Sequence, residues 1–379
     1  MWFTWWRRML FVMNIPIFNT YISPKASEYV SRVLESTYLS EGVKVKEFES
    51  QLTSRLGWVN PIAVNSGTSA LHLALVLAGI EAGDEVICPA QTFVATGLVV
   101  LQQKATVIFA DIQYESGNID PKSIEKKVTK KTKAIMPVHW GGAPCDMDEI
   151  GAIADAYDLT VVEDAAHATG ATYKGRPVGS ISQFTCFSFQ AIKHITTGDG
   201  GAVCCLDKSD AEQAFVKRWF GIDRAHSQPS ILGERQYDIA SIGYKYHMND
   251  YAAALGLANL EGFAERLARR RKIASYYRNA LGSIDGIRPF ITSSDRESAE
   301  WLFGMHVERR NDFIRALQSR EVTASVVHLG IDHNSCFGER KRDLSNQDKF
   351  NETQVHIPIH DGLTDETVAT VVAAVKAGW

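Results

Sequence analysis

The sequence is poor in cysteine, and its few cysteines form no recognisable pattern. There are six in 379 residues, and none belongs to a CxxC pair. So few and so scattered thiols exclude a disulfide framework and give no reason to expect a metal site. We expect a protein of the reducing cytoplasm, because domains that depend on disulfides are cysteine-rich and come from oxidising compartments.

The sequence also lacks an excess of charge of either sign. Lys and Arg total 40 and Asp and Glu total 44, which gives a net charge of −4. A chain this close to neutral has no electrostatic basis for binding nucleic acid or an anionic membrane. Its content of 45% hydrophobic and 22% charged residues excludes a disordered or collagen-like chain. At about 150 residues per domain, the length predicts two or three folding units.

The first 13 residues, MWFTWWRRMLFVM, match no targeting segment. A signal peptide places its basic residues ahead of a longer apolar run and ends at small residues, and this segment does neither. It is also shorter than the roughly 20 apolar residues that a membrane span needs. We interpret residues 1–12 as the product of an upstream translation start, with Met13 beginning the folded protein, in preference to a membrane-surface anchor.

Short apolar segments alternate with helical ones over the first 205 residues. Strands alternating with helices indicate crossover connections and a mostly parallel sheet. Nearly continuous apolar runs indicate strands that are buried on both faces. The expected strands cover residues 61–65, 84–88, 106–111, 133–138, 160–164, 183–188 and 201–205. The expected helices lie near residues 68–79, 92–103, 121–128 and 146–157.

The pattern changes after about residue 207. A helical period without proline runs through residues 249–281 and predicts one long helix. Farther along, strands are expected near 301–308 and 322–328, and helices near 309–319 and 364–377. We therefore predict an α/β protein with a large domain over 14–250, a connecting long helix over 251–282 and a smaller C-terminal α/β domain over 283–379.

Polar residues gather where the first and fifth expected strands end. Ligands of parallel sheets bind beyond the carboxyl ends of the strands, so both places are candidate sites. The first strand leads through Ser66, Thr68 and Ser69 into a helix. Small hydroxyl residues there fit an anion site, although a helix N-cap without a ligand is more common. The fifth strand ends in Glu163-Asp164, where Asp164 either caps the next helix or pairs with a buried cation on a ligand.

The sixth strand leads through Ser188 to a lysine and a glycine-rich turn. Lys193 lies between Ile192 and Ile195, whereas a solvated lysine usually lies on a polar helix face. A buried lysine loses affinity for its proton and becomes a usable nucleophile. An anion site, a buried acid and a buried lysine together favour a Schiff-base cofactor with a phosphate tail and a basic ring nitrogen, namely pyridoxal 5′-phosphate.

Five segments in this order resemble the DegT/StrS family of nucleotide-sugar aminotransferases, which are pyridoxal-phosphate enzymes of fold type I. They read NSGTSALHLAL, GDEVICPAQTFVAT, PVHWGGAPCDM, VVEDAAHATGATYKG and FSFQAIKHITTGDGGAV. The resemblance covers residues 14–280 well and the C-terminal lobe more loosely. It implies a fold type I aminotransferase whose large domain holds a mostly parallel, seven-stranded sheet.

The resemblance implies a role for each matching residue. Lys193 matches the lysine that forms the internal aldimine and moves the proton, and Asp164 matches the acid that pairs with the pyridinium nitrogen. The other implied cofactor contacts are Thr68, Ser69 and Ser188 at the phosphate, Phe93 on the ring and His167 near the phenolic oxygen.

The resemblance also implies a homodimer with shared active sites. The segment that would reach the neighbouring subunit's phosphate reads GYKYHMND and lacks asparagine at the family position, so Lys245 or His247 is expected to substitute. The implied amino donor is L-glutamate and the acceptor a nucleotide keto-sugar, with a 4-keto-6-deoxy sugar favoured. His328, His333 and Asn334 are candidates for substrate contacts, and turn or surface roles are equally compatible with them.

Two other functions stay open. A sugar dehydratase of the same family would use pyridoxamine phosphate and replace the lysine with histidine. Here His194 adjoins Lys193, but the lysine occupies the anchoring position, which favours transamination. A non-enzymatic, regulatory member would have a degraded site or an added DNA-binding segment, and the sequence shows neither.

Overall fold

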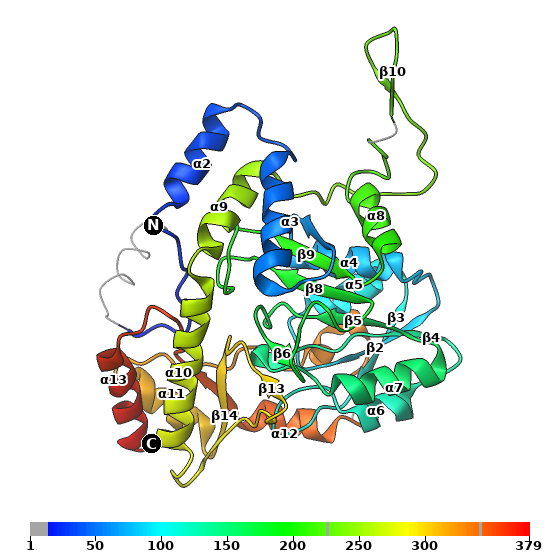
Figure 1. Cartoon of the computed structure of the whole chain (residues 1–379). Helices are drawn as coiled ribbons and strands as arrows, with labels where there is room; N and C mark the ends of the chain where they lie inside the picture. Colours follow the sequence, from blue (N-terminus) through cyan, green and yellow to red (C-terminus); the bar gives the residue numbers. More distant parts are fainter. Residues whose placement is uncertain (1–13, 225–226, 341–342) are drawn as a thin grey trace, which may run out of the picture.

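A seven-stranded sheet forms the centre of the molecule (Figure 1). The structure is a computed structural model that describes residues 14–224, 227–340 and 343–379. The interpretation of residues 1–12 and Met13 lies outside these ranges. The sheet contains β1 (Pro61–Val64), β2 (Glu85–Pro89), β3 (Thr106–Ala110), β4 (Thr132–Ile135), β5 (Thr160–Asp164), β8 (Phe184–Ser188) and β9 (Gly201–Cys205).

The strands lie in the order β1-β9-β8-β5-β4-β2-β3. Neighbours from β8 to β3 are parallel, and β9 is antiparallel to both β8 and β1. The predicted seven-stranded, mostly parallel sheet is therefore confirmed. Because β5 and β8 are adjacent and parallel, their last residues, Asp164 and Ser188, lie at the same edge of the sheet.

Helices cover both faces of this sheet. Leu73 of α4 and Val99 of α5 pack in one apolar cluster with strand residues such as Val86 and Val203. Phe48 of α3 and Leu257 of α9 pack in a second cluster, on the other side, with Ala63, Phe187 and Ala202. The helices of this part are α2 (Ala26–Glu35), α3 (Val43–Leu56), α4 (Gly67–Leu77), α5 (Ala95–Gln102), α6 (Pro121–Lys127), α7 (Met147–Tyr157), α8 (Lys208–Lys217) and α9 (Asp250–Leu260).

The C-terminal part has an apolar cluster of its own. A three-stranded antiparallel sheet, in the order β12-β14-β15, packs against α10, α11 and α13. The division into domains stays a prediction. The elements are α10 (Phe263–Leu281), β12 (Ile287–Pro289), β14 (Phe303–Val307), α11 (Arg310–Gln318), α12 (Ser345–Thr353), β15 (Gln354–Ile357) and α13 (Asp365–Lys376).

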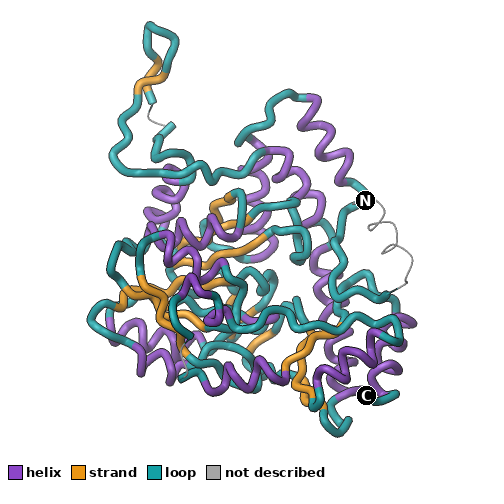
Figure 2. Tube along the Cα trace, turned by 180° about the vertical axis from the view of Figure 1, so that it is seen from behind, coloured by secondary structure: helices purple, strands orange, loops and turns teal. Residues whose placement is uncertain are grey.

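Two short pairings of strands lie outside these sheets. One is a small sheet in the order β13-β6-β7, made of β6 (Thr172–Tyr173), β7 (Arg176–Pro177) and β13 (Arg296–Glu297). The other is the hairpin of β10 (Gln228–Pro229) and β11 (Arg235–Gln236), which stands away from the rest of the chain in the front and rear views (Figures 1 and 2).

The structure corrects two of the predicted elements. The single long helix over 251–282 is wrong, because the chain breaks between α9 and α10 at Gly262, whose φ of +64° lies in the left-handed region that favours glycine. The strand over 322–328 is also wrong, since Val322 and Ser325 form only isolated bridges. The sequence analysis also left unpredicted the helices α2, α3, α8 and α12 and the C-terminal strands β12 and β15.

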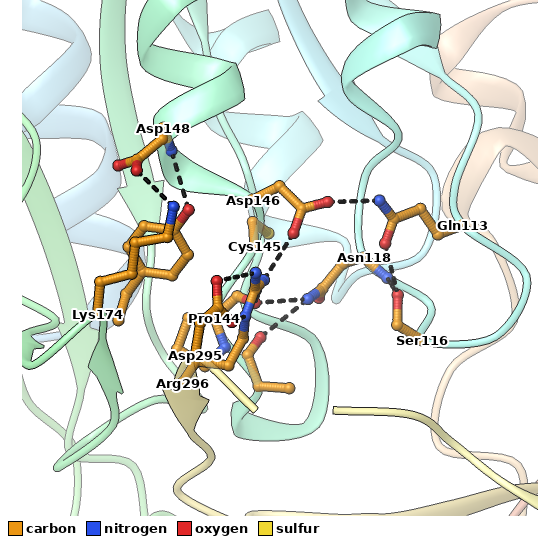
Figure 3. A network of polar contacts seen from close by, with 12 residues as sticks. Gln113, Ser116, Asn118, Pro144, Cys145, Asp146, Asp148, Lys174, Asp295 and Arg296 are labelled. Carbon is orange, nitrogen blue, oxygen red and sulfur yellow. Dashed lines mark hydrogen bonds and ion pairs between the residues drawn. The ribbon is translucent and has the colours of Figure 1, made fainter. Parts of the chain in front are cut away.

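A polar network fixes the segment between β4 and α7 (Figure 3). The Asn118 side chain donates to the carbonyls of Ala143 and Pro144, both at 3.0 Å, and Arg296 also donates to Pro144 at 2.9 Å. Arg296 further pairs with Asp146 at 2.7 Å. These bonds satisfy the backbone groups of an irregular segment, which holds it in one conformation.

None of the helices in residues 14–224, 227–340 and 343–379 is long and apolar enough to cross a lipid bilayer.

Asn259 joins three parts of the chain, and its removal should destabilise the fold. The fully buried side chain accepts from the Ser23 N–H and donates to the Thr196 carbonyl, each at 2.8 Å. We expect Asn259→Ala to lower the free energy of unfolding by about 2–4 kcal/mol, because two buried backbone groups lose their partners. Urea unfolding measures this. The exposed Asn311→Ala should change it by less than about 0.5 kcal/mol, and equal effects of the two variants would contradict the assignment.

Candidate active site

A cavity of about 300 Å³ lies beyond the carboxyl ends of β5 and β8. Its walls come from the first turn of α4, the segments that follow β2, β5 and β8, and two residues of the C-terminal part. The structure brings together at this cavity seven residues predicted from the sequence: Thr68, Phe93, Asp164, His167, Ser188, Lys193 and His328. Five predicted residues do not line it: Ser69, Lys245, His247, His333 and Asn334.

The first turn of α4 forms one end of the cavity. Ser66 caps the helix, since its Oγ accepts from the Ser69 N–H at 3.0 Å. A Cβ on Gly67 would lie 2.8 Å from the Cβ of Ser188, so only glycine allows the helix start to lie this close to β8. A helix N-terminus with free backbone N–H groups attracts anions. This end of the cavity is therefore suited to a phosphate.

Asp164 is a buried carboxylate at the wall of the cavity. Its Oδ2 accepts from the Thr96 hydroxyl at 2.7 Å, and its Oδ1 accepts from the Ala166 N–H at 3.2 Å. Burial raises the pKa of Asp164 above its ordinary value, while the Thr96 hydrogen bond acts in the opposite direction. A cationic ligand next to Asp164 would stabilise the ionised form of this buried carboxyl group. The sequence analysis quoted the segment QTFVAT but missed the role of Thr96.

The neighbouring acid, Glu163, has a different surrounding. It lies at 2.7 Å from His139 Nε2 and also accepts from the Thr185 hydroxyl and the Ser182 N–H. Burial alone would raise the pKa of Glu163, but the bonds from His139, Ser182 and Thr185 bring it below the ordinary value. Glu163 is thus satisfied within the protein, and only Asp164 of this acid pair is available to a ligand.

Lys193 lies in the loop between β8 and β9. Burial lowers the pKa of Lys193 to about 7, and the charge of Asp164 opposes this shift. A large fraction of the side chain is therefore a neutral amine near neutral pH, which is the nucleophilic form. Its Nζ lies 3.6 Å from the centre of a Trp301 ring.

Trp301 is a wall residue that sequence reasoning missed. It is fully buried, stacks on His167 at 3.8 Å with an angle of 13° and donates from Nε1 to the Ile192 carbonyl at 3.0 Å. Its only sequence signal was an aromatic at the start of an expected strand, which is ordinary in a core.

Two histidines at the cavity favour the neutral form. Burial lowers the pKa of His167 well below its ordinary value, and Nδ1 of this side chain has no hydrogen-bond partner in the described residues. Burial likewise lowers the pKa of His328 to about 4. His328 has a φ of +64°, and its carbonyl accepts from the amides of Gln91 and Gln354, each at 3.1 Å.

The predicted residues outside the cavity have local contacts. The Lys245 Nζ lies 4.9 Å from the Trp219 ring centre, and the His247 ring meets the same tryptophan edge-on at 4.2 Å. His333 Nδ1 contacts the Gly330 carbonyl, and Asn334 donates to the Ile331 carbonyl at 2.8 Å. Substrate and cofactor roles for these four residues stay predictions.

Comparison with known proteins identifies the family. The model of the DegT/DnrJ/EryC1/StrS aminotransferase family matches residues 20–376, which is nearly the whole chain. The chain belongs to this family. The predicted aminotransferase is therefore confirmed at the level of the family.

Named relatives of this aminotransferase cover nearly its full length. The spore coat polysaccharide biosynthesis protein SpsC of Bacillus subtilis is 38% identical, covering 94% of both chains. A GDP-perosamine synthase of Caulobacter vibrioides is 34% identical, covering 92% of this chain and 93% of the relative. The UDP-4-amino-4-deoxy-L-arabinose–oxoglutarate aminotransferase of Shewanella sediminis is 30% identical, covering 96% and 97%.

Solved structures agree with this assignment. The sugar aminotransferase CalS13 of Micromonospora echinospora superposes with a TM-score of 0.92 at 36% identity, covering 96% of this chain and all of that one. The putative sugar aminotransferase Spr1654 of Streptococcus pneumoniae, solved in a PLP form and a PMP form, superposes with a TM-score of 0.88 at 29% identity. The PLP form covers 96% of this chain and 98% of that one. The fold type I prediction is confirmed.

Burial of Lys193 should make the stability of the cofactor-free aminotransferase depend on pH. Its pKa is about 7 when folded, against about 10.4 in an unfolded chain. The unfolded state therefore binds the proton more tightly, and stability falls as the pH decreases from about 10 to 7. Lys193→Met removes this cost, and the variant should be the more stable one at pH 7, by on the order of several kcal/mol.

Urea unfolding of the two proteins from pH 6 to pH 10 measures this difference. The difference should shrink as the pH rises toward 10. The matched control is Lys122→Met on the exposed surface of α6, whose stability should follow the wild type at every pH. A Lys193→Met variant whose difference from the wild type stays constant with pH would refute the depressed pKa.

Proposed function

We propose that this aminotransferase uses pyridoxal 5′-phosphate to move an amino group from L-glutamate to a keto carbon of a nucleotide-linked deoxysugar. The observation that carries the proposal is the meeting of Lys193, Asp164 and the N-terminus of α4 in one cavity. We favour a 4-keto-6-deoxy sugar as acceptor. The name of the Shewanella relative supports both a 4-amino product and the oxoglutarate–glutamate pair, and two relatives carry a nucleotide in their names.

The residues of the cavity fit this cofactor. The glycine at 67 leaves room at the helix start, and Asp164 is a buried acid whose ionised form a cation would stabilise. The buried Nδ1 of His167 has no hydrogen-bond partner among the residues that the structure describes. These three features match a phosphate, a protonated ring nitrogen and a polar ring substituent. The PLP and PMP forms of the solved relative support the same cofactor.

Each residue would then hold one part of the group. The backbone of the α4 first turn, with Thr68 and Ser188, would hold the phosphate, and Ser69 would act through its 2.8 Å contact to Ser66. Asp164 would pair with the ring nitrogen, Phe93 would lie against the ring and His167 near its oxygen. When bound, the cofactor supplies an aldehyde for amine capture and a ring that withdraws electrons from the reacting carbon.

Lys193 is the group that moves the proton. Its Nζ is neutral in a large fraction of molecules near pH 7, so it can accept a proton from the carbon of the amino donor. It can then return a proton to the keto carbon of the acceptor. His328 and Phe93 both line the cavity, and their rings pack against each other with centres 5.2 Å apart.

A dehydratase that used His194 in place of the lysine has no support from the geometry. His194 does not line the cavity, and its Nε2 lies at 2.7 Å from the Ala299 carbonyl. Lys193, in contrast, does line it. The geometry of this site therefore favours transamination over dehydration.

We also propose a homodimer in which Lys245 or His247 of one copy reaches the phosphate site of the other. Both side chains lie outside the cavity of their own chain, near Trp219. His333 and Asn334 bond within their own turn and do not line the cavity, whereas His328 lines it, so His328 is the stronger candidate for a substrate contact.

The reaction should depend on Lys193. Purified wild type with pyridoxal phosphate should show the yellow absorbance of a lysine-bound cofactor, and L-glutamate should bleach it. Lys193→Ala should lower glutamate-dependent amination of nucleotide keto-sugars by roughly 10³-fold or more, because the proton-transfer group is lost. The exposed Lys122→Ala should keep full turnover. Full turnover in Lys193→Ala, or a colourless wild type that binds DNA, would exclude the proposal.

The close approach of Gly67, at the start of α4, to Ser188 should control the affinity for the cofactor. Gly67→Ala places a Cβ 2.8 Å from that of Ser188, so the helix start must shift away from the phosphate position. We expect the Kd for pyridoxal phosphate, from absorbance titration of the cofactor-free protein, to rise about tenfold or more, which corresponds to one lost charge-assisted hydrogen bond.

Gly151→Ala is the matched control for this titration. Gly151 is a helical glycine, and no atom of the described part of the chain lies within 4 Å of the added Cβ, so cofactor affinity should not change. Unchanged affinity in Gly67→Ala would show that the phosphate binds elsewhere.

A further inference from the structure

Trp301 contacts the lysine loop at two points. The centre of a Trp301 ring lies 3.6 Å from the Lys193 Nζ, and Nε1 of the same indole donates to the carbonyl of Ile192, the preceding residue. One side chain therefore holds both the amino group and the backbone next to it. Trp301 comes from the C-terminal part of the chain, whereas Lys193 belongs to the central sheet's loop.

We propose that Trp301 is a positioning residue for Lys193: its indole face holds the amino group inside the cavity while its N–H fixes the loop backbone. The inference rests on the proposed function, in which Lys193 is the reacting amine. In this proposal Trp301 need not contact the substrate, because Trp301 acts through Lys193.

Trp301 is itself held by a glycine turn. The N–H of Trp301 donates to the Gly141 carbonyl at 2.9 Å, and that of Ala299 to the Gly142 carbonyl at 3.0 Å. Gly142 has a φ of +104°, and a Cβ there would lie 3.1 Å from the Trp301 nitrogen. In the segment PVHWGGAPCDM, Gly142 therefore allows residues 300–301 to approach this turn closely, and the turn holds the indole next to the lysine.

The turn has support from behind. Asn118 accepts from the Trp140 N–H at 2.9 Å through its side-chain oxygen, and its amide donates to Ala143 and Pro144. Arg296 reaches the same Pro144 carbonyl (Figure 3). These bonds fix the turn on both sides of Gly141, so the position of Trp301 does not depend on a free loop.

A strained residue precedes Trp301. Glu300 is buried with a φ of +51°, a conformation that is costly for a residue other than glycine. Arg278 donates to both carboxylate oxygens, at 2.8 and 3.0 Å, and Ser298 Oγ accepts from the Glu300 N–H at 3.0 Å. These bonds hold an unfavourable backbone conformation at the residue next to Trp301.

An aromatic face should also affect the proton of Lys193. The quadrupole of the ring attracts the ammonium form, whereas the apolar bulk of the side chain disfavours it. The other charged or titratable groups around the amine are Asp164, His167, His194, Asp199 and His328. Trp301 also stacks on His167, so every substitution changes the contact of that histidine as well. The comparison of the Phe variant with the Leu and Met variants therefore separates the effect of an aromatic face from the effect of replacing Trp301.

The test measures Lys193 in the cofactor-free, full-length protein. Trace acetic anhydride labels neutral amines, and mass spectrometry of the Lys193 peptide gives the pH at which labelling is half-maximal. The exposed Lys122 in the same digest serves as an internal control. The variants are Trp301→Phe, which keeps a ring face, and Trp301→Leu and Trp301→Met, which keep apolar bulk without one. The Leu and Met variants are used together so that a packing defect in one of them does not decide the result.

We expect the labelling midpoint of Lys193 to fall by about one pH unit in the Leu and Met variants, since a desolvated cation–π contact is worth about that much. The Phe variant should stay within about 0.3 unit of the wild type. The midpoint of Lys122 should not move. Unchanged midpoints in both the Leu and Met variants, or an equal fall in the Phe variant, would overturn the role of the indole.

The same proteins separate this inference from the proposed function. A wild type with the expected midpoints that captures no pyridoxal phosphate would overturn the proposed cofactor chemistry and leave the role of Trp301 standing. A wild type that captures the cofactor, with equal Lys193 midpoints in all three variants, would overturn the role of Trp301 alone.

Discussion

The burial of an amine and an acid in one cavity is the constraint on which the site depends. Burial shifts the pKa of Lys193 downward and that of Asp164 upward, so each group is driven toward its uncharged form. These shifts reflect an electrostatic cost of burial that a ligand can relieve. A protonated ring nitrogen beside Asp164 would let that carboxylate ionise in a paired state, and an aldehyde would consume the free amine. The site therefore favours a ligand that carries both a protonated ring nitrogen and an aldehyde, because such a ligand offsets the cost of burial at both residues.

The sheet makes this arrangement possible at low cost. Adjacent parallel strands end at the same edge, so Asp164 and the chain that leads to Lys193 leave the core side by side. The second acid, Glu163, alternates to the opposite side of its strand and is satisfied by His139 and Thr185. Of these two consecutive acids, Glu163 is bonded within the protein and Asp164 faces the cavity, because successive side chains of a strand point to opposite faces of the sheet.

The sequence predicts this edge well because its signals are local. Apolar runs mark all seven strands of the sheet, and polar residues at their ends mark Thr68, Asp164, Ser188 and Lys193 before any contact is known. The errors have two causes. The helical periodicity runs on across Gly262, although a left-handed backbone at that glycine ends the helix. Thr96 and Trp301 carry no local signal of a role at the site, since only packing brings them to Asp164 and Lys193.

The wall that completes the cavity comes from the far end of the chain, and this has a consequence for how the site is maintained. The loop that carries Lys193 is bonded to residues 298–301 at two points. The indole Nε1–H of Trp301 donates to the Ile192 carbonyl, and His194 Nε2 contacts the Ala299 carbonyl. Those residues are tied in turn to the turn at Gly141 and Gly142. Displacement of the C-terminal part would therefore remove the indole from the amine and admit water to the cavity, which would restore the ordinary, protonated state of the lysine. The reactive form of Lys193 is thus a property of the assembled chain, because the central sheet places the lysine and the C-terminal part supplies the wall that keeps it dry.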